Sequence, residues 1–201
     1  MKNKSLLMTI AILIIALSSV AQETGTFTDP RDGKVYKTVK IGTQTWFAEN
    51  LAYKASKGCW AYNNDTNNVK TYGYLYDWKA AKTSCPTGWH LPSDDEWTTL
   101  VTYLGGANVA GGKLKEIGTT HWDKPNTGAT NESGFTALPG GYRYPDSPNE
   151  NLGYSGYWWS STEQVNSYGD YWFRNIASRF NAVYRYDRGG KSAYSVRCIK
   201  D

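Results

Sequence analysis

The order of apolar and polar residues predicts a β-hairpin near the start of the chain. Residues 33–41 read GKVYKTVKI and alternate in character at every second position, which is the period of a β-strand. Gly42 and Thr43 then provide a tight turn, and the run from Thr45 to Ala48 predicts the returning strand. We therefore expect a two-stranded hairpin in this part of the chain.

The clearest helix is expected immediately after Ser93. Ser93 and Glu96 have the spacing of an S-x-x-E capping box, in which each side chain accepts a hydrogen bond from a backbone N–H at the helix start. Asp94 and Asp95 place negative charge in the first turn, where the helix dipole favours it. Apolar residues continue at helical spacing until the glycine pair 105–106, which is expected to end the helix.

A shorter helix is predicted earlier, over residues 72–82. Leu75, Trp78 and Ala81 share one stripe of this segment at helical spacing. His90 follows in the connection to the capped helix and lies between two apolar residues. Because the chain has only two histidines, His90 is interpreted as a hydrogen-bonded core residue and a site with several histidine ligands is excluded.

Beyond residue 106 the chain is rich in glycine and in turn-forming residues. Short strands are expected to dominate here, spaced as in a twisted antiparallel sheet with long loops. The fold class predicted from these patterns is therefore α+β: an N-terminal hairpin, two helices and then the sheet. The strand candidates are 135–138, 156–162, 171–176, 182–186 and 193–199.

The length of the chain is that of one domain. Its 201 residues, 40% of them hydrophobic, are enough for one sizeable core and too few to favour two. The domain is expected over residues 33–201, after a short linker at 22–32.

The first residues have the features of an export signal. Lys2 and Lys4 precede an apolar run, and Ala21 ends a stretch of small residues that signal peptidase recognises, so residues 1–21 are predicted to be a signal peptide. The alternative is an uncleaved anchor, although the apolar run is shorter than the ~20 residues that span a membrane. We expect an exported protein, in the periplasm, at the cell surface or outside the cell, with no integral membrane segment after cleavage.

The charge of the chain argues against a nucleic-acid partner. Loss of Lys2 and Lys4 with the signal peptide lowers the net charge from +4 to +2. Basic and acidic residues alternate along the sequence, and no lysine or arginine cluster forms a phosphate-binding stripe.

Three cysteines occur in a chain that is predicted to enter an oxidising compartment, where disulfides persist. Cys85 lies just before the capped helix and Cys198 lies in the final strand, facing inward by the alternation of that strand. We predict a disulfide between these two. Cys59 is then the remaining thiol, and we interpret it as a small buried hydrophobic residue and not as a nucleophile.

Several motifs in order resemble the Fibrobacter succinogenes major paralogous domain. The resemblance extends from about Gly33 to Asp201, and it implies an exported bacterial protein of the C-type-lectin-like fold group. Family members often carry a partner cysteine for the one at Cys59, and Val69 stands at the matching position here, which agrees with the pairing of Cys85 and Cys198. The motifs are VKIGTQTWFAENLAY, YGYLYDWKAA, CPTGWHLPSDDEW, SGFTALPGGYR, GYWWSSTE, YWFR and SVRCIKD.

The expected function is that of a non-catalytic module that binds a glycan or a surface protein through loops at the sheet edge. By the resemblance these loops are Thr119–Gly134 and Tyr142–Gly156. The second loop carries aromatic rings on which a sugar or a peptide can stack and oxygen atoms that can accept hydrogen bonds or bind calcium. The candidate ligand-binding residues are Tyr142, Tyr144, Asp146, Asn149, Glu150, Asn151 and Tyr154.

Other functions remain as alternatives. A structural or adhesive surface protein has the same sequence features. An enzyme related to the formylglycine-generating oxidases is disfavoured, because those enzymes need a pair of copper-binding cysteines and only Cys59 is left. No cofactor is expected except calcium, for which the polar run 63–68 is a second candidate, although a plain Asx turn explains that run better.

Overall fold

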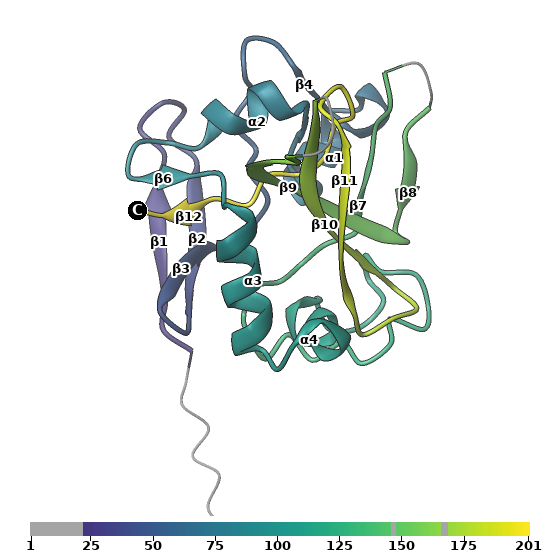
Figure 1. Cartoon of the computed structure of the whole chain (residues 1–201). Coiled ribbons are helices and arrows are strands. Elements are labelled where there is room, and N and C mark those ends of the chain that lie inside the picture. Colours follow the sequence, from purple (N-terminus) through teal and green to yellow (C-terminus); the bar gives the residue numbers. More distant parts are fainter. Residues whose placement is uncertain (1–21, 146–147, 166–168) are drawn as a thin grey trace, which may run out of the picture.

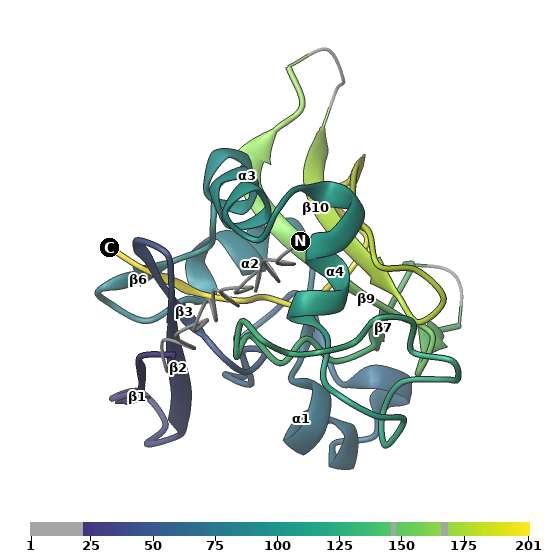
Figure 2. The ribbon, with the colours of Figure 1, turned by 90° about the horizontal axis from the view of Figure 1, so that it is seen from below.

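The computed structural model describes residues 22–145, 148–165 and 169–201 and shows an α+β fold built on two five-stranded sheets. The predicted signal peptide lies outside the described residues. Figure 1 shows the two sheets on either side of helix α3. Seen from below, the hairpin strands and the strands β9 and β10 lie on opposite sides of the molecule (Figure 2).

The longest connection between described elements joins α4 to β7 and spans residues 115–139. The first sheet contains, in spatial order, β1 (Thr24–Thr28), β2 (Val35–Ile41), β3 (Gln44–Phe47), β12 (Ile199–Lys200) and β6 (Trp89–His90). The second contains β11 (Val183–Gly189), β10 (Asp170–Ala177), β9 (Ser155–Glu163), β7 (Gly140–Tyr142) and β8 (Glu150–Leu152). A third, two-stranded sheet pairs β4 (Cys59–Trp60) with β5 (Leu75–Tyr76). The helices are the 3-10 turn η1 (Tyr62–Asn64), α1 (Asn67–Tyr72), α2 (Trp78–Ser84), α3 (Asp94–Tyr103) and α4 (Ala107–Leu114).

The predicted hairpin is confirmed as β2 and β3, which pair antiparallel across Gly42. The structure adds a strand that the sequence did not reveal: β1 lies inside the segment expected to be a linker and pairs along β2. The linker prediction was therefore wrong for residues 24–28. Strand β12 returns beside β3, so the end of the chain closes the sheet that the hairpin begins.

The capped helix is confirmed as α3. The Ser93 Oγ accepts from the Glu96 backbone N–H at 3.1 Å, and the Glu96 carboxylate accepts from the Ser93 N–H at 2.7 Å. Asp94 interacts favourably with the helix dipole and also has a second role. It is buried and accepts hydrogen bonds from Arg174 and Arg185. The first turn of α3 is thereby tied to strands β10 and β11.

The helix predicted over residues 72–82 was wrong. The structure has α1 before it, the strand β5 inside it and α2 across its end. Gly73 separates the first two, with a φ of 73° and a position where a Cβ would lie 2.5 Å from the Leu51 carbonyl oxygen. Asp77 then starts α2 as its N-cap, accepting from the Ala80 N–H.

Helix α4 was also missed, because the glycine-rich chain beyond residue 106 was expected to form short strands. Gly111 and Gly112 instead let the helix approach other backbone closely. A Cβ on Gly111 would lie 2.5 Å from the Ala182 carbonyl oxygen, and one on Gly112 would lie 2.4 Å from that of Gly128. The prediction of two helices thus falls short by α1 and α4.

Three of the five predicted strands are confirmed, at 156–162, 171–176 and 182–186, as β9, β10 and β11. The other two are not regular strands. Residues 135–138 make one isolated bridge, and the segment 193–199 makes three before it enters β12. This final segment crosses from the second sheet to the first, visible as the yellow trace in Figure 1, and therefore joins the two.

The predicted disulfide is confirmed. Cys85 and Cys198 are bonded across 113 residues of chain, which fixes the end of α2 to the final segment. Cys59 is a half-buried free thiol whose Sγ contacts the Ala55 carbonyl oxygen. Burial raises the pKa of Cys59, so the neutral thiol predominates at pH 7.

Asn50 is the centre of a buried polar network, here called the Asn50 centre. Its Oδ1 accepts from Trp158 Nε1 at 2.9 Å and from Arg197 Nε at 3.1 Å, and its Nδ2 donates to the Tyr72 carbonyl oxygen at 2.8 Å. The guanidinium of Arg197 also donates to the carbonyl oxygens of Phe47, Phe135 and Thr136. These bonds join the hairpin, the second sheet and the final segment in the interior.

Candidate functional site

The strongest candidate site is an aromatic surface on one side of the second sheet. Residues directly opposite in an antiparallel pair share a face, as do residues two apart on one strand. The register pairs Tyr186 with Phe173, and Asn175 with both Tyr184 and Tyr157. We call this surface the tyrosine face, and its members are Tyr142, Tyr144, Tyr157, Phe173, Tyr184, Tyr186 and Arg188.

Ring contacts connect the tyrosine face without interruption. Tyr186 lies 5.9 Å from Phe173, which lies 6.1 Å from Tyr157, measured between ring centroids. Tyr157 is 5.0 Å from Tyr142, which is 4.6 Å from Tyr144. The inner rings belong to the core, whereas the outer ones reach solvent: Phe173 is 6% exposed and Tyr186 is 49% exposed.

Hydrogen bonds from neighbouring polar side chains hold two of these tyrosine rings in place. Arg188 Nη2 donates to the Tyr144 hydroxyl at 2.6 Å, and its guanidinium carbon lies 4.8 Å from the centre of the Tyr144 ring. Asn151 Nδ2 donates to the Tyr157 hydroxyl at 2.8 Å. The rings of Tyr144 and Tyr157 are thus each fixed by a hydrogen bond at the polar end and by packing along the apolar body.

The deepest tyrosine is held by a carboxylate. The Tyr142 hydroxyl donates to Glu150 Oε2 at 2.7 Å, across the pairing of β7 with β8. Burial, together with the adjacent Glu150 carboxylate, raises the pKa of Tyr142. The hydroxyl therefore stays protonated over the physiological range and remains a hydrogen-bond donor.

The structure brings four of the seven predicted ligand-binding residues together on this surface. Tyr142 and Tyr144 are members of it. Glu150 accepts a hydrogen bond from Tyr142, and Asn151 donates one to Tyr157. Tyr142 is buried, so it supports the surface and cannot offer a flat ring to a ligand. Tyr154 and Asn149 are half-buried, and Tyr154 lies near enough to Tyr157 to contribute to its raised pKa, of which burial is the main cause. Asp146 lies outside the described residues. The role of this set in binding stays a prediction.

Sequence reasoning missed the members contributed by β11. Tyr184, Tyr186 and Arg188 alternate with more exposed or charged residues at a period of two, which is the signal of a strand with one aromatic face. That signal shows neither which strand lies beside β11 nor that Tyr157 lies on the same side. The cross-strand register was needed for both.

The first predicted loop, Thr119–Gly134, is a packed loop in the structure. Trp122 and Asn126 within it are buried. The ammonium of Lys115, also fully buried, donates to the carbonyl oxygens of Thr127, Ala177, Ser178 and Phe180 at 2.9–3.4 Å. Burial lowers the pKa of Lys115 to about 8. These buried groups fix parts of the loop against the core.

Three of the candidate calcium ligands, Asp65, Glu150 and Asn151, make side-chain hydrogen bonds within the protein. Asp65 Oδ1 accepts from the Asn67 N–H at 2.9 Å, which is the Asx turn that the polar run 63–68 predicts. Glu150 and Asn151 bond to tyrosine hydroxyls. Among the described residues, no three His, Cys, Asp or Glu side chains gather as a metal site would require.

His90 differs from its prediction as a core residue, since its side chain is 41% exposed. It is hydrogen-bonded as expected, with Nε2 at 2.8 Å from Glu96 and Nδ1 at 2.7 Å from Asp201. Partial burial opposes protonation, but the hydrogen bonds to the two carboxylates outweigh it and raise the pKa of His90. The three groups tie the chain end to the start of α3.

Comparison with known families gives one result. A model of the Fibrobacter succinogenes major domain matches residues 39–200. The chain belongs to this family. No curated protein matches the chain, and no solved structure matches it. The Fibrobacter succinogenes major domain of this chain includes β3, all four α-helices and the whole second sheet, whereas β1 precedes the matched region.

Family membership indicates a surface or secreted domain, and the disulfide agrees with export. Within the ranges that the structure describes, no helix combines the length and the apolar character needed to cross a membrane. The matched region of the Fibrobacter succinogenes major domain contains the Asn50 centre and every member of the tyrosine face.

Proposed function

We propose that this protein is an exported, non-catalytic module that binds a glycan through the tyrosine face. One observation carries the proposal: a continuous row of rings runs from the core to the surface, and its outer members, Tyr144, Tyr184 and Tyr186, are half-buried or exposed. An aromatic surface that is rigid and partly exposed offers apolar contact at a small cost in side-chain entropy.

The chemistry of the surface suits a sugar. The C–H groups on one side of a pyranose ring pack on an aromatic ring, while its hydroxyls need both donors and acceptors. The tyrosine face supplies both: Arg188 is a donor, and the exposed Glu150 carboxylate accepts from Tyr142 through one oxygen. This mixture of a few polar groups around apolar area is typical of small-ligand sites.

The resemblance to C-type-lectin-like folds supports the same surface. In that fold group ligands usually lie on the loops that interrupt the sheet, and the loop Tyr142–Gly156 borders the tyrosine face here. We place the protein in the periplasm, at the cell surface or outside the cell. Calcium is not required by the proposal, since apolar contact with the rings and the donor and acceptor groups beside them carry the binding.

A non-catalytic role is supported by the cysteines. Copper-dependent oxidases of the related fold group use a pair of active-site cysteines, and here Cys85 and Cys198 form the disulfide. The carboxylate of Asp94 is neutralised by two arginines, and that of Glu96 caps α3. These groups therefore have structural partners.

A second candidate, adhesion to another protein, is favoured by the position of β11. Within the described strands β11 is an edge strand, paired with β10 on one side. An edge strand presents backbone N–H and C=O groups to which an extended peptide can add. The same tyrosines would then contact side chains of the partner.

A glycan array, run with and without calcium, tests the proposal. We expect discrete hits that persist in chelator and that are lost in Tyr186→Ser. The matched control is Tyr103→Ser, which removes an exposed tyrosine on α3, away from the tyrosine face. Hits that survive Tyr186→Ser would show that the glycan binds elsewhere. An array without hits would contradict glycan binding and favour the protein partner.

A further inference from the structure

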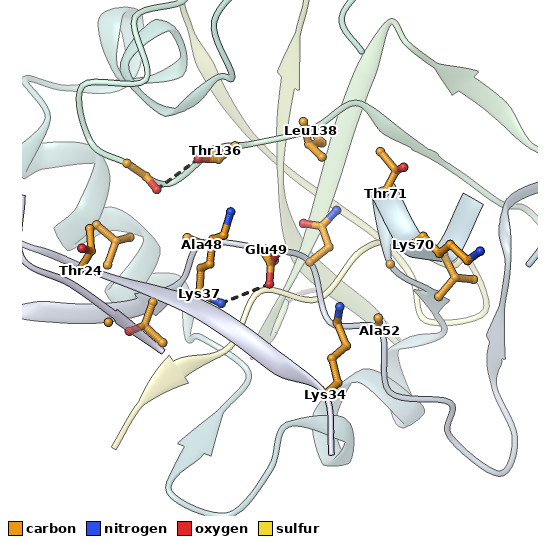
Figure 3. A pocket seen from close by; sticks show the side chains of 17 residues that line it. Thr24, Lys34, Lys37, Ala48, Glu49, Ala52, Lys70, Thr71, Thr136 and Leu138 are labelled. Atoms are coloured by element: carbon orange, nitrogen blue, oxygen red, sulfur yellow. Dashed lines mark hydrogen bonds between the residues drawn. The ribbon is translucent and has the colours of Figure 1, made fainter. Parts of the chain in front are cut away.

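A second concave site lies on a part of the molecule that shares no residue with the tyrosine face. Its volume is about 380 Å³, and its walls come from β1, β2, the segment after β3, α1 and residues 134–138 (Figure 3). We call it the lysine pocket. Cavities of this size are at the small end of ligand sites and hold one compact molecule.

Three lysines line the pocket: Lys34 and Lys37 from β2 and the turn before it, and Lys70 from α1. No carboxylate of the described residues lies within 4.0 Å of any of these three ammonium groups. The next lysine on β2 differs, because Lys40 pairs with Glu23 at 3.0 Å. Figure 3 shows Lys34 and Lys37 on either side of Glu49, with Lys70 at the far end.

A fourth positive charge lies beneath the wall. Asn50 and Thr136 line the pocket, and both accept hydrogen bonds from Arg197, which is 0% exposed. In the described part of the chain, the oxygens that accept hydrogen bonds from this guanidinium are all neutral. Burial lowers the pKa of Arg197 to about 9, so the group is still charged at neutral pH. Its field is poorly screened, because low-dielectric protein surrounds it.

Glu49 is the single acidic residue among those that line the pocket. Its Oε2 accepts from the Lys37 backbone N–H at 3.2 Å, and it compensates part of the charge of Arg197. Three lysines and a buried arginine thus face one carboxylate. A concavity lined by charge of one sign concentrates counter-ions, so this excess attracts an anion.

We infer that the lysine pocket binds a small hydroxylated organic anion of the size of one acidic sugar unit. The anionic group lies between the Lys34 and Lys37 ammonium groups, where charge-assisted hydrogen bonds form. A hydroxyl of the ligand donates to Glu49, whose Oε1 has no partner among the described residues. The chemistry fits a carboxylate, as in a uronate, and equally a sulfate ester.

Titration calorimetry at low salt, with the full mature protein, tests the inference and separates the two anions. The probes are D-glucuronate, glucose 6-sulfate and neutral D-glucose. We expect one or both acidic sugars to bind, D-glucose not to bind, and the affinity to fall as salt is raised. Equal binding of D-glucose, or no binding of either acidic sugar, overturns the inference.

Matched variants locate the anion. Lys34→Gln and Lys37→Gln should each weaken binding by about fivefold or more, the loss expected for one charged hydrogen bond. Lys40→Gln, on the same strand and outside the pocket, is the control and should leave the affinity unchanged. Glu49→Gln should strengthen binding of the anion, because it removes a negative charge and keeps an acceptor for the Lys37 N–H.

The same variants can also give a result that contradicts the inference. Equal weakening of anion binding by Lys37→Gln and Lys40→Gln would show diffuse attraction to a basic surface. It would overturn the inference that the anion binds in the lysine pocket. Near-UV circular dichroism shows whether each variant is folded. The array result on the tyrosine face is independent of this titration, since the two sites have no residue in common.

Discussion

The Asn50 centre and the tyrosine face both combine aromatic rings with hydrogen-bonding groups, but they differ in what their polar atoms contact. In the Asn50 centre, Asn50 and Arg197 bond to buried protein groups on every side. On the tyrosine face, Arg188 and Glu150 bond to tyrosine hydroxyls and are otherwise open to solvent. A buried polar group loses free energy if it is left unbonded, whereas a half-exposed one can exchange water for a ligand.

This difference predicts that substitutions in the first region reduce stability and that substitutions in the second reduce binding. The final segment, which carries both Arg197 and Cys198, gives the largest effects because it joins the two sheets. The tyrosine face gives the smallest effects on stability. If substitutions on the tyrosine face reduced stability more than those in the final segment, the distinction between the two regions would be contradicted.

The double variant Cys85→Ala/Cys198→Ala should lose the most stability. Its disulfide closes 113 residues of chain, and loss of a long-range disulfide costs about 2–5 kcal/mol through the freedom that the unfolded chain regains. Urea denaturation measures the loss, and Cys59→Ala, which removes the unbonded thiol, is the control. A loss no larger than that of the control would show that the final segment is held by packing alone.

Arg197→Met should lose about 3 kcal/mol, because it leaves buried carbonyl oxygens of Phe47, Phe135 and Thr136 without their donor. The matched control is Arg179→Met at an exposed position. Urea denaturation of both variants gives the difference. Equal stability would mean that the apolar methionine compensates for the lost bonds, and the Asn50 centre would then not differ from the surface.

The stability of the protein should rise with pH between 8 and 10 through Lys115. Its pKa is about 8 when folded, against 10.5 for a free lysine, so in this window the unfolded chain binds more protons and deprotonation favours the folded state. The gain is roughly 1 kcal/mol by pH 9. The measurement is the difference in pH slope between the wild type and Lys115→Met. Parallel slopes would contradict the assignment.

Tyr186→Ser should change stability by less than about 1 kcal/mol, because half of the side chain is already in water. The same variant should abolish the glycan hits. A stability loss as large as that of Arg197→Met would make Tyr186 a core residue, and the tyrosine face would then lose its distinction from the Asn50 centre.

Local patterns predicted several elements correctly. The capping box defines the start of α3 because Ser93 and Glu96 lie within one helical turn, and alternation defines β2, β9, β10 and β11. The sequence pattern was misleading where one residue type, glycine, occurs both in turns and at close contacts between backbones. The glycine-rich chain beyond residue 106 favoured strands and turns, but Gly111 and Gly112 lie in a helix, where their lack of a Cβ allows α4 to approach the backbone of residues 128 and 182.

The sequence by itself determined the family, the disulfide and the α+β class, because motifs, cysteine positions and periodicity are local features. It also pointed to the loop beside Tyr142 and Tyr144. Only the tertiary structure decided that Tyr157 and Tyr186 lie on the same surface, and that Lys34, Lys37 and Lys70 line one pocket with Glu49. Strand register and the packing of distant segments place these groups together, and both depend on the whole fold.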